Sequence, residues 1–284
     1  MNRGNYIYNA NFSLRKYIFS ELNQSTLNIH IKLNSITLSV TNNFSKKNIG
    51  FVHYPINNFL DADFIISRLK TLKDEEELLN YKYEHIKIIL YDNPFIVIPQ
   101  EVTTDEYPDY FQMYHQINPE TVCEDFTLKN KIKIVSAIST KASKQFTELF
   151  DNYTIKNYQS DFINYLLNIQ GKNKSIVAYI NILEEKADLI VINGNELLFI
   201  NRFEYTSDED ILYYVLSVFE QLELNVETNF VYFLGQIELN DSLHELLKKY
   251  IRNIDTCPYK LQQELNNKIT HQESYFLDVF INSN

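Results

Sequence analysis

Residues 174–234 read KSIVAYINILEEKADLIVINGNELLFINRFEYTSDEDILYYVLSVFEQLELNVETNFVYFL, and the interpretation of the whole chain starts from their pattern. Three runs alternate apolar and polar residues, as half-buried strands do, and they cover residues 175–181, 186–193 and 196–204. Asn193-Gly194-Asn195 separates the second run from the third, and these residue types tolerate the positive φ of a tight hairpin. An amphipathic segment and a buried apolar run, 230–234, follow. The stretch therefore predicts the order β-β-β-α-β.

The amphipathic segment carries clear signals of a helix. Ser207 lies three residues before Asp210, which is the spacing of a capping box, and the acidic residues that follow Ser207 match the positive end of a helix dipole. Apolar residues then recur at helical spacing, at Ile211, Leu212, Val215, Leu216, Phe219 and Leu222. We expect this helix to cover one face of a sheet.

The first half of the chain repeats the same order. Alternating runs at 27–33, 36–40 and 50–55 precede a helix that begins near Asp61, and a strand follows at 85–91. Two copies of one supersecondary unit predict an α/β protein of two similar lobes. Gly171 follows a helical pattern as a C-cap, so we place the lobes at 1–170 and 171–284, with an irregular, aromatic-rich excursion near 100–125 in the first.

Composition limits the class of protein. An apolar fraction of 45%, with 21 Tyr and 19 Phe in 284 residues, predicts a folded globular chain. Cys123 and Cys257 stand far apart without ligand spacing, and no long apolar run or signal peptide is found. These features predict a reduced cytoplasmic protein without membrane insertion. The net charge of −11 opposes binding to nucleic acid, because phosphate contacts rely on Lys and Arg.

The duplicated β-β-β-α-β units resemble the actin-like ATPase fold, which is built from two ribonuclease-H-like lobes, each β-β-β-α-β-α. Several motifs resemble an uncharacterised bacterial family assigned that fold, namely Val191–Phe199, the helix with Tyr213-Tyr214 and Gln221-Leu222, Val231–Gly235 and Ile98–Val102. The characterised relatives of that family are the pilus-assembly actin-like ATPases. The resemblance covers most of residues 27–255 and implies a two-lobed protein of a class that binds nucleotides.

The resemblance also implies where a nucleotide would bind. Active members use a Gly-rich turn between the first two strands of each lobe, an Asp on the first strand for the metal, and a Gly-rich adenosine loop. In the first lobe, His30 stands where the Asp would be and Lys32 where a Gly would be, followed by Asn34 and Ser35.

In the second lobe, Tyr179 or Asn181 replaces the Asp, depending on a register that the sequence leaves open. The adenosine loop keeps only Gly235. Glycine matters in such loops because a non-Gly residue forced into the left-handed region costs about 1–2 kcal/mol. These positions are therefore candidate degenerate phosphate turns.

No other catalytic pattern emerges from the sequence. The chain has five glycines and none of the common phosphate-loop, hydrolase or metalloprotease motifs. His30 and His53 lie on neighbouring predicted strands, but no third ligand accompanies them, so we interpret them as exposed strand histidines and predict no metal site. The aromatic residues of the excursion indicate either a recognition surface or a loop packed by its own side chains, and they are Tyr107, Tyr110, Phe111 and Tyr114.

The sequence thus predicts a non-catalytic, degenerate actin-like-fold protein that binds a protein partner or associates with itself, without a cofactor. The alternative is a nucleotide-binding actin-like ATPase that uses ATP with Mg at an unconventional site.

Overall fold

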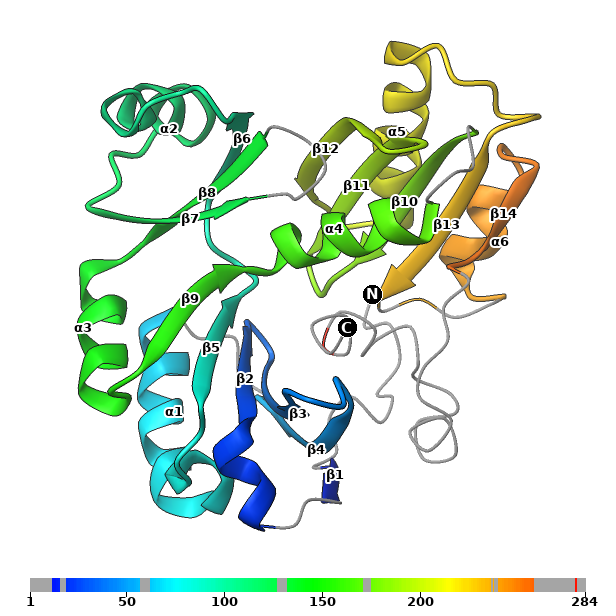
Figure 1. The fold of residues 1–284 in the computed structure, drawn as a ribbon. Coiled ribbons are helices and arrows are strands. Elements are labelled where there is room, and N and C mark those ends of the chain that lie inside the picture. Colours follow the sequence, from blue (N-terminus) through cyan, green and yellow to red (C-terminus); the bar gives the residue numbers. More distant parts are fainter. Residues whose placement is uncertain are drawn as a thin grey trace. The chain divides into compact units, whose positions relative to one another are not determined.

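Figure 1 shows the computed structural model. It describes residues 12–15, 19–56, 62–126, 132–170, 175–235, 237, 240–257 and 279. Contacts between Cα atoms divide the chain into two compact units, which among the described residues are 12–162 with 279 and 163–257. This division falls inside helix α4 (Tyr158–Gln170), and the lobe boundary placed at residue 170 stays a prediction. The sequence also predicts that the apolar run 275–281 docks on the body of the protein, and this run lies outside the described residues except for Val279.

The first unit contains a six-stranded sheet. In spatial order its strands are β1 (Phe12–Arg15), β4 (Asn48–Pro55), β3 (Ser35–Asn42), β2 (Ser25–Lys32), β5 (His85–Leu90) and β9 (Tyr153–Asn157). Strands β2 to β4 are antiparallel, whereas β2, β5 and β9 run parallel. The accompanying helices are α1 (Ala62–Glu75), α3 (Thr140–Leu149) and the short helices η2 (Phe19–Gln24) and η3 (Glu77–Asn80). Leu69 of α1 and Phe146 of α3 share one buried core with Ile29 and Leu38 of the sheet.

A small three-stranded sheet is inserted into this unit. It has the order β6 (Phe95–Pro99), β8 (Ile132–Ile138), β7 (Thr121–Phe126), and it is accompanied by η4 (Thr104–Glu106) and α2 (Tyr107–His115). The stretch near 100–125 was expected to be irregular, and that expectation is wrong. Pro108 lies in the first turn of α2, where proline is well tolerated, so it begins a helix rather than interrupting one.

The second unit contains a five-stranded sheet. Its order is β12 (Glu196–Glu204), β11 (Lys186–Asn193), β10 (Ile176–Ile182), β13 (Phe230–Gly235), β14 (Asn253–Thr256), with helices α5 (Asp208–Gln221) and α6 (Ser242–Lys248). The predicted capping box is confirmed, because Ser207 Oγ accepts the Asp210 N–H at 3.2 Å and Asp210 Oδ2 accepts the Ser207 N–H at 2.9 Å. Apolar side chains of α5 and α6 share a core with β10, β11 and β13.

The two units repeat one connectivity. In each, three antiparallel strands lead through a helix to a strand that pairs in parallel with the first of the three, β2 with β5 and β10 with β13. The predicted order β-β-β-α-β is therefore confirmed in both. Among the described residues, no helix has the length and the apolar content needed to cross a membrane.

Candidate functional site

The first candidate turn is a two-residue hairpin at the end of β2. Lys32 pairs with Ser35, so Leu33 and Asn34 form the loop. Asn34 is held twice, because its carbonyl accepts the Ile56 N–H at 2.6 Å and its Oδ1 accepts the Ser35 hydroxyl at 3.3 Å. Ser35 is buried. The backbone of this turn is thus fixed by contacts within its own unit.

His30, the residue expected at the position of the metal-binding Asp, is fully buried. Its Nδ1 lies 3.0 Å from the Tyr91 hydroxyl and its Nε2 lies 3.4 Å from Ser39 Oγ. Burial, with smaller contributions from the Lys32 and Lys87 ammonium groups, holds the pKa of His30 well below its usual value. The imidazole is therefore neutral at physiological pH, with one nitrogen as hydrogen-bond donor and the other as acceptor.

Lys32, where the resemblance would place a glycine, is also buried. Its Nζ lies 4.7 Å from the centre of the Tyr91 ring, a cation–π distance. Tyr91 in turn stacks on Tyr158 with ring centres 4.4 Å apart and planes 5° from parallel. Tyr91 therefore contacts His30 through its hydroxyl and Lys32 through its ring. Tyr91 directly follows strand β5, and no motif in the sequence marks it as a site residue.

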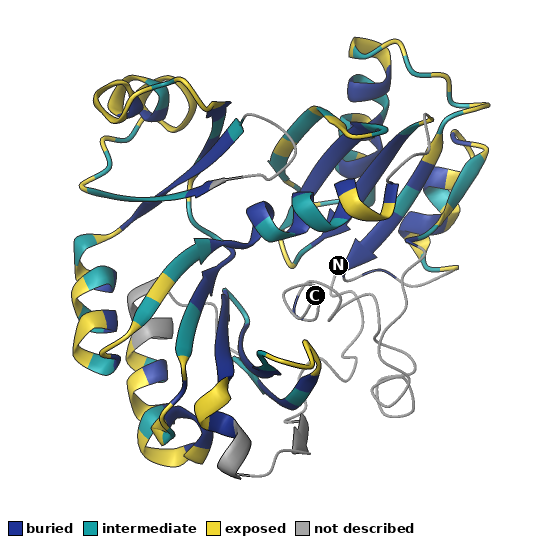
Figure 2. Ribbon diagram, viewed as in Figure 1, coloured by how far each residue is buried: buried dark blue, intermediate teal, exposed yellow. Residues whose placement is uncertain are grey.

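The two strand histidines are buried, so their interpretation as exposed residues is wrong. His53 Nδ1 lies 2.8 Å from Thr37 Oγ1, and Thr37 stands between His30 and His53 in the strand register. On the same face, Asn28 Nδ2 donates to Ser39 Oγ at 3.3 Å. Figure 2 shows β2 and β3 buried along most of their length. Alternation separates the two faces of a strand, but it assigns the polar face to solvent only where that face is uncovered.

In the second unit, Tyr179 is buried and internally bonded. Its hydroxyl donates to Gln170 Oε1 at 3.0 Å, and Gln170 Nε2 donates to the Ser175 carbonyl at 3.0 Å. Burial raises the pKa of Tyr179 far above its usual value, so the phenol stays protonated and acts as a donor. The side chain thus joins β10 to the end of α4.

Asn181 and Gly235 come together at the ends of β10 and β13. Gly235 has a φ of +81°, and a Cβ placed there would lie 2.1 Å from the Ile182 carbonyl oxygen and 2.7 Å from Asn181 Oδ1. The glycine is thus required by the close approach of the two strands. The turn between β10 and β11 consists of Glu184-Glu185, since the Leu183 N–H donates to the Lys186 carbonyl at 2.8 Å.

A buried carboxylate that the sequence analysis missed lies next to Asn181. Asp188 of β11 pairs with Asn181 in the sheet register and is fully buried. The Arg202 guanidinium binds it in bidentate fashion, with Nε 2.8 Å from Oδ1 and Nη2 3.2 Å from Oδ2. Asp188 shares its face of β11 with the buried Ile190 and Ile192, and its only signal in the sequence was a charge within an otherwise apolar run.

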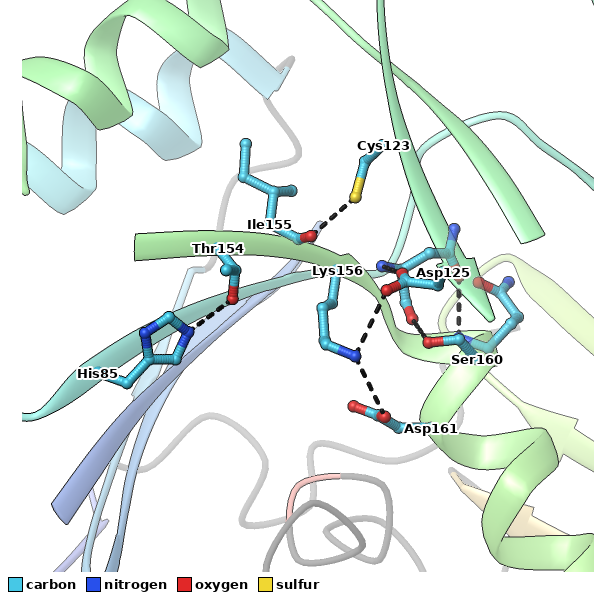
Figure 3. Close-up of polar contacts among 10 residues, drawn as sticks. His85, Cys123, Asp125, Thr154, Ile155, Lys156, Ser160 and Asp161 are labelled. Carbon is cyan, nitrogen blue, oxygen red and sulfur yellow. Dashed lines mark hydrogen bonds and ion pairs between the residues drawn. The ribbon is translucent and has the colours of Figure 1, made fainter. Parts of the chain in front are cut away.

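A second polar cluster lies where β7, β9 and the start of α4 meet (Figure 3). Lys156 Nζ lies 3.4 Å from Asp125 Oδ1 and 3.9 Å from Asp161 Oδ1, and Asp125 Oδ2 accepts the Asn157 N–H at 2.8 Å. Burial disfavours the Lys156 ammonium, but Asp161 and Asp125 outweigh it and raise the pKa of Lys156. These contacts attach the small sheet to the large one.

Cys123 belongs to this cluster as well. Its Sγ donates to the Ile155 carbonyl at 2.7 Å, and burial raises the pKa of the thiol to about 12. A protonated thiol is a poor nucleophile, so Cys123 is a structural residue. Within the described part of the chain, no three His, Cys, Asp or Glu side chains are placed to hold a metal ion.

The aromatic residues of the insertion divide into two groups. Tyr107 and Phe111 are buried against Ile98 and Val135 of the small sheet, and Lys133 Nζ donates to the Tyr107 hydroxyl at 2.6 Å. Tyr114, by contrast, is 64% exposed, and its neighbour Met113 is 74% exposed. Tyr110 is partly buried against the same core, so packing accounts for three of the four predicted aromatic residues and Tyr114 is the one that lies in solvent.

The connectivity of the two units and their neighbours among solved structures define an actin-like ATPase fold. A Bacteroides thetaiotaomicron protein, described as having this fold and an unknown function, matches with a TM-score of 0.79 and 22% identity, covering 89% of this chain and 98% of that one. The PilM-PilN type IV pilus biogenesis complex matches with a TM-score of 0.57 and 11% identity, covering 91% and 98%. At these identities the likeness shows the fold alone.

The chain belongs to the family described as "Protein of unknown function (DUF3822)", whose model matches residues 15–254. No curated protein matches it. The resemblance to an uncharacterised family of actin-like ATPase fold is therefore confirmed.

Proposed function

We propose that this protein is a non-catalytic binding or scaffold protein of the cytoplasm, which keeps the actin-like fold to hold a protein partner. One observation carries the proposal. Three of the residues at the candidate phosphate turns are buried and engaged within their own units, His30 and Lys32 with Tyr91, and Tyr179 with Gln170. A phosphate site needs backbone N–H groups that are open to the ligand.

The residues present do not fit ATP with Mg. The positions that would carry a metal-anchoring carboxylate hold His30 and, in either register, Tyr179 or Asn181. Asp188, the buried carboxylate beside Asn181, is bound by Arg202. The space beside Gly235 is filled by the Ile182 carbonyl. We therefore derive no catalytic step through a nucleotide.

A protein partner is the class of ligand that we favour. The net charge of −11 opposes a nucleic acid. The exposed Met113 and Tyr114 of α2 are large apolar side chains of the kind that anchor interfaces. The structural neighbour PilM was solved in a complex with a second protein, PilN, which supports the use of this fold in partner binding. The partner in this proposal is either another protein or a second copy of this chain.

Calorimetric titration with Mg-ATP, with ADP and metal-free ATP as controls, tests the proposal. A site filled at a hundred times its dissociation constant would add about 2.7 kcal/mol and raise the melting temperature by several degrees. We expect no heat of binding in the titration, and no rise of the melting temperature in a thermal melt with the same ligands. A shift that Lys32→Met abolishes would replace the proposal with the alternative, a nucleotide-binding actin-like ATPase. Strictly monomeric behaviour together with an empty affinity capture would also contradict the proposal.

A further inference from the structure

Strand β12 forms an edge of the second sheet. It is nine residues long, and within the part of the chain that the structure describes it pairs only with β11. The Tyr205 N–H donates to the Glu185 carbonyl, directly after the strand. Because hydrogen-bonded residues alternate along an antiparallel strand, the backbones of Phe199, Asn201 and Phe203 face β11, and those between them face away.

The backbone groups that point away from β11 belong to Ile200, Arg202 and Glu204. The register irregularity opposite Val191 and Ile192 limits this straight segment on its N-terminal side. Side chains already cover two of the outward groups, since Asn201 Oδ1 accepts the Arg202 N–H at 2.9 Å and the Tyr214 hydroxyl donates to the Glu204 carbonyl at 3.1 Å. The N–H and C=O of Ile200 have no such cover among the described residues. The centre of the edge is thus open to a further strand.

One face of this edge carries a row of aromatic rings. Phe199 and Phe203 lie 6.5 Å apart, Tyr214 stacks on Phe203 at 4.4 Å, and Tyr213 meets Tyr214 edge-on at 5.8 Å. Tyr213 is 67% exposed. A strand added to β12 would place every second side chain beside these rings, where aromatic and apolar groups gain contact area.

The surroundings of the edge are acidic. Exposed carboxylates belong to Glu185, Glu196, Glu204 and Glu209, whereas the nearby cations are Lys186, opposite Glu204, and Arg202, whose charge is taken up by Asp188. Charge complementarity therefore favours a basic partner segment.

We infer that β12 binds an extended segment of a partner protein, with alternating apolar side chains flanked by Lys or Arg, by strand addition along Ile200–Glu204. The segment hydrogen-bonds to Ile200 and lays its apolar side chains against Phe203 and Tyr214, while one of its basic ends meets Glu204. This inference rests on the proposed partner-binding function and specifies the partner.

A blocked peptide, Lys-Val-Thr-Phe-Thr-Val-Lys, serves as the probe, with an analogue N-methylated at its central residues as the matched control. NMR of the full chain follows the Ile200 amide. We expect binding of the first peptide to slow hydrogen exchange at Ile200, and the N-methylated analogue to bind at least tenfold more weakly. Ile200→Pro removes an N–H that points away from β11, so it should keep the fold and also weaken binding at least tenfold.

Charge provides the second comparison. Glu204→Lys should weaken binding several-fold, whereas Glu148→Lys, an exposed residue of α3 in the other unit, should leave it unchanged. No binding, or equal binding to the Ile200→Pro variant, would overturn the inference. Protection of Ile200 that grows with protein concentration in the absence of peptide would also overturn it in favour of a second copy. These results are independent of the Mg-ATP titration, so a failure of this inference can be distinguished from a failure of the proposed function.

Discussion

Gly235→Ala should destabilise the protein by about 2–5 kcal/mol in the absence of any ligand. The φ of +81° alone costs an alanine about 1–2 kcal/mol. The new Cβ would lie 2.1 Å from the Ile182 carbonyl oxygen, where ordinary contact begins at 3.4 Å, so β10 and β13 must separate by the difference, 1.3 Å. Such overpacking adds about 1–3 kcal/mol.

Urea unfolding measures this loss, with tyrosine fluorescence as the signal because the chain has 21 Tyr and no Trp. Gly194→Ala is the matched control, since Gly194 also has a positive φ, +58°, in the hairpin between β11 and β12. Backbone strain alone predicts a loss of about 1–2 kcal/mol for that control. If the two variants lost equal stability, the close approach of β10 and β13 would not be the reason for a glycine at position 235.

Two further predictions concern buried charge. The lowered pKa of His30 means that the unfolded chain binds the proton more readily, so stability should fall as the pH drops below about 6.5, by about 1.4 kcal/mol between pH 7.5 and 5.5. Burial also lowers the pKa values of His85 and His244, so urea unfolding at both pH values should show that His30→Gln reduces the total difference by about 1.4 kcal/mol while Tyr91→Phe does not. An unchanged difference in the first variant would show that His30 does not contribute to it. Arg202→Met should cost about 3–5 kcal/mol, because Asp188 stays buried without its guanidinium, and adding Asp188→Leu should recover most of the loss in a double-mutant cycle. A double variant no more stable than Arg202→Met would contradict this.

The β-β-β-α-β order of both units could be predicted from the sequence, because the signals for strands and helix starts are local. Alternation marked the strands, and the Ser207 capping box marked the start of α5. The same local signals failed for the stretch near 100–125, where dense aromatic residues were interpreted as an irregular excursion. The helix there is stabilised by contacts distant in sequence, such as the buried Lys133 that donates to the Tyr107 hydroxyl. Such contacts leave no periodic trace.

The resemblance supplied candidate positions for a site, but the sequence could not supply their environment. The resemblance gave residue numbers, and the structure shows that His30 and Lys32 share Tyr91, which lies about sixty residues away in the sequence. Burial of the polar face of β2 and β3 was not predictable, because alternation distinguishes two faces without saying what covers either one. The pairing of Asp188 with Arg202 likewise depends on the register between β11 and β12.

These environments explain why one substitution would not create a metal site. His30→Asp would place a carboxylate in a fully buried position beside the Tyr91 hydroxyl and Ser39, and such a charge costs several kcal/mol unless a cation compensates it. Lys32 is the nearby cation on the same strand, but its ammonium already lies over the Tyr91 ring. If Lys32 paired with the introduced carboxylate instead, it would neutralise the charge that a metal needs. Tyr91 therefore links the two positions, and both must change with it before a cation could bind there.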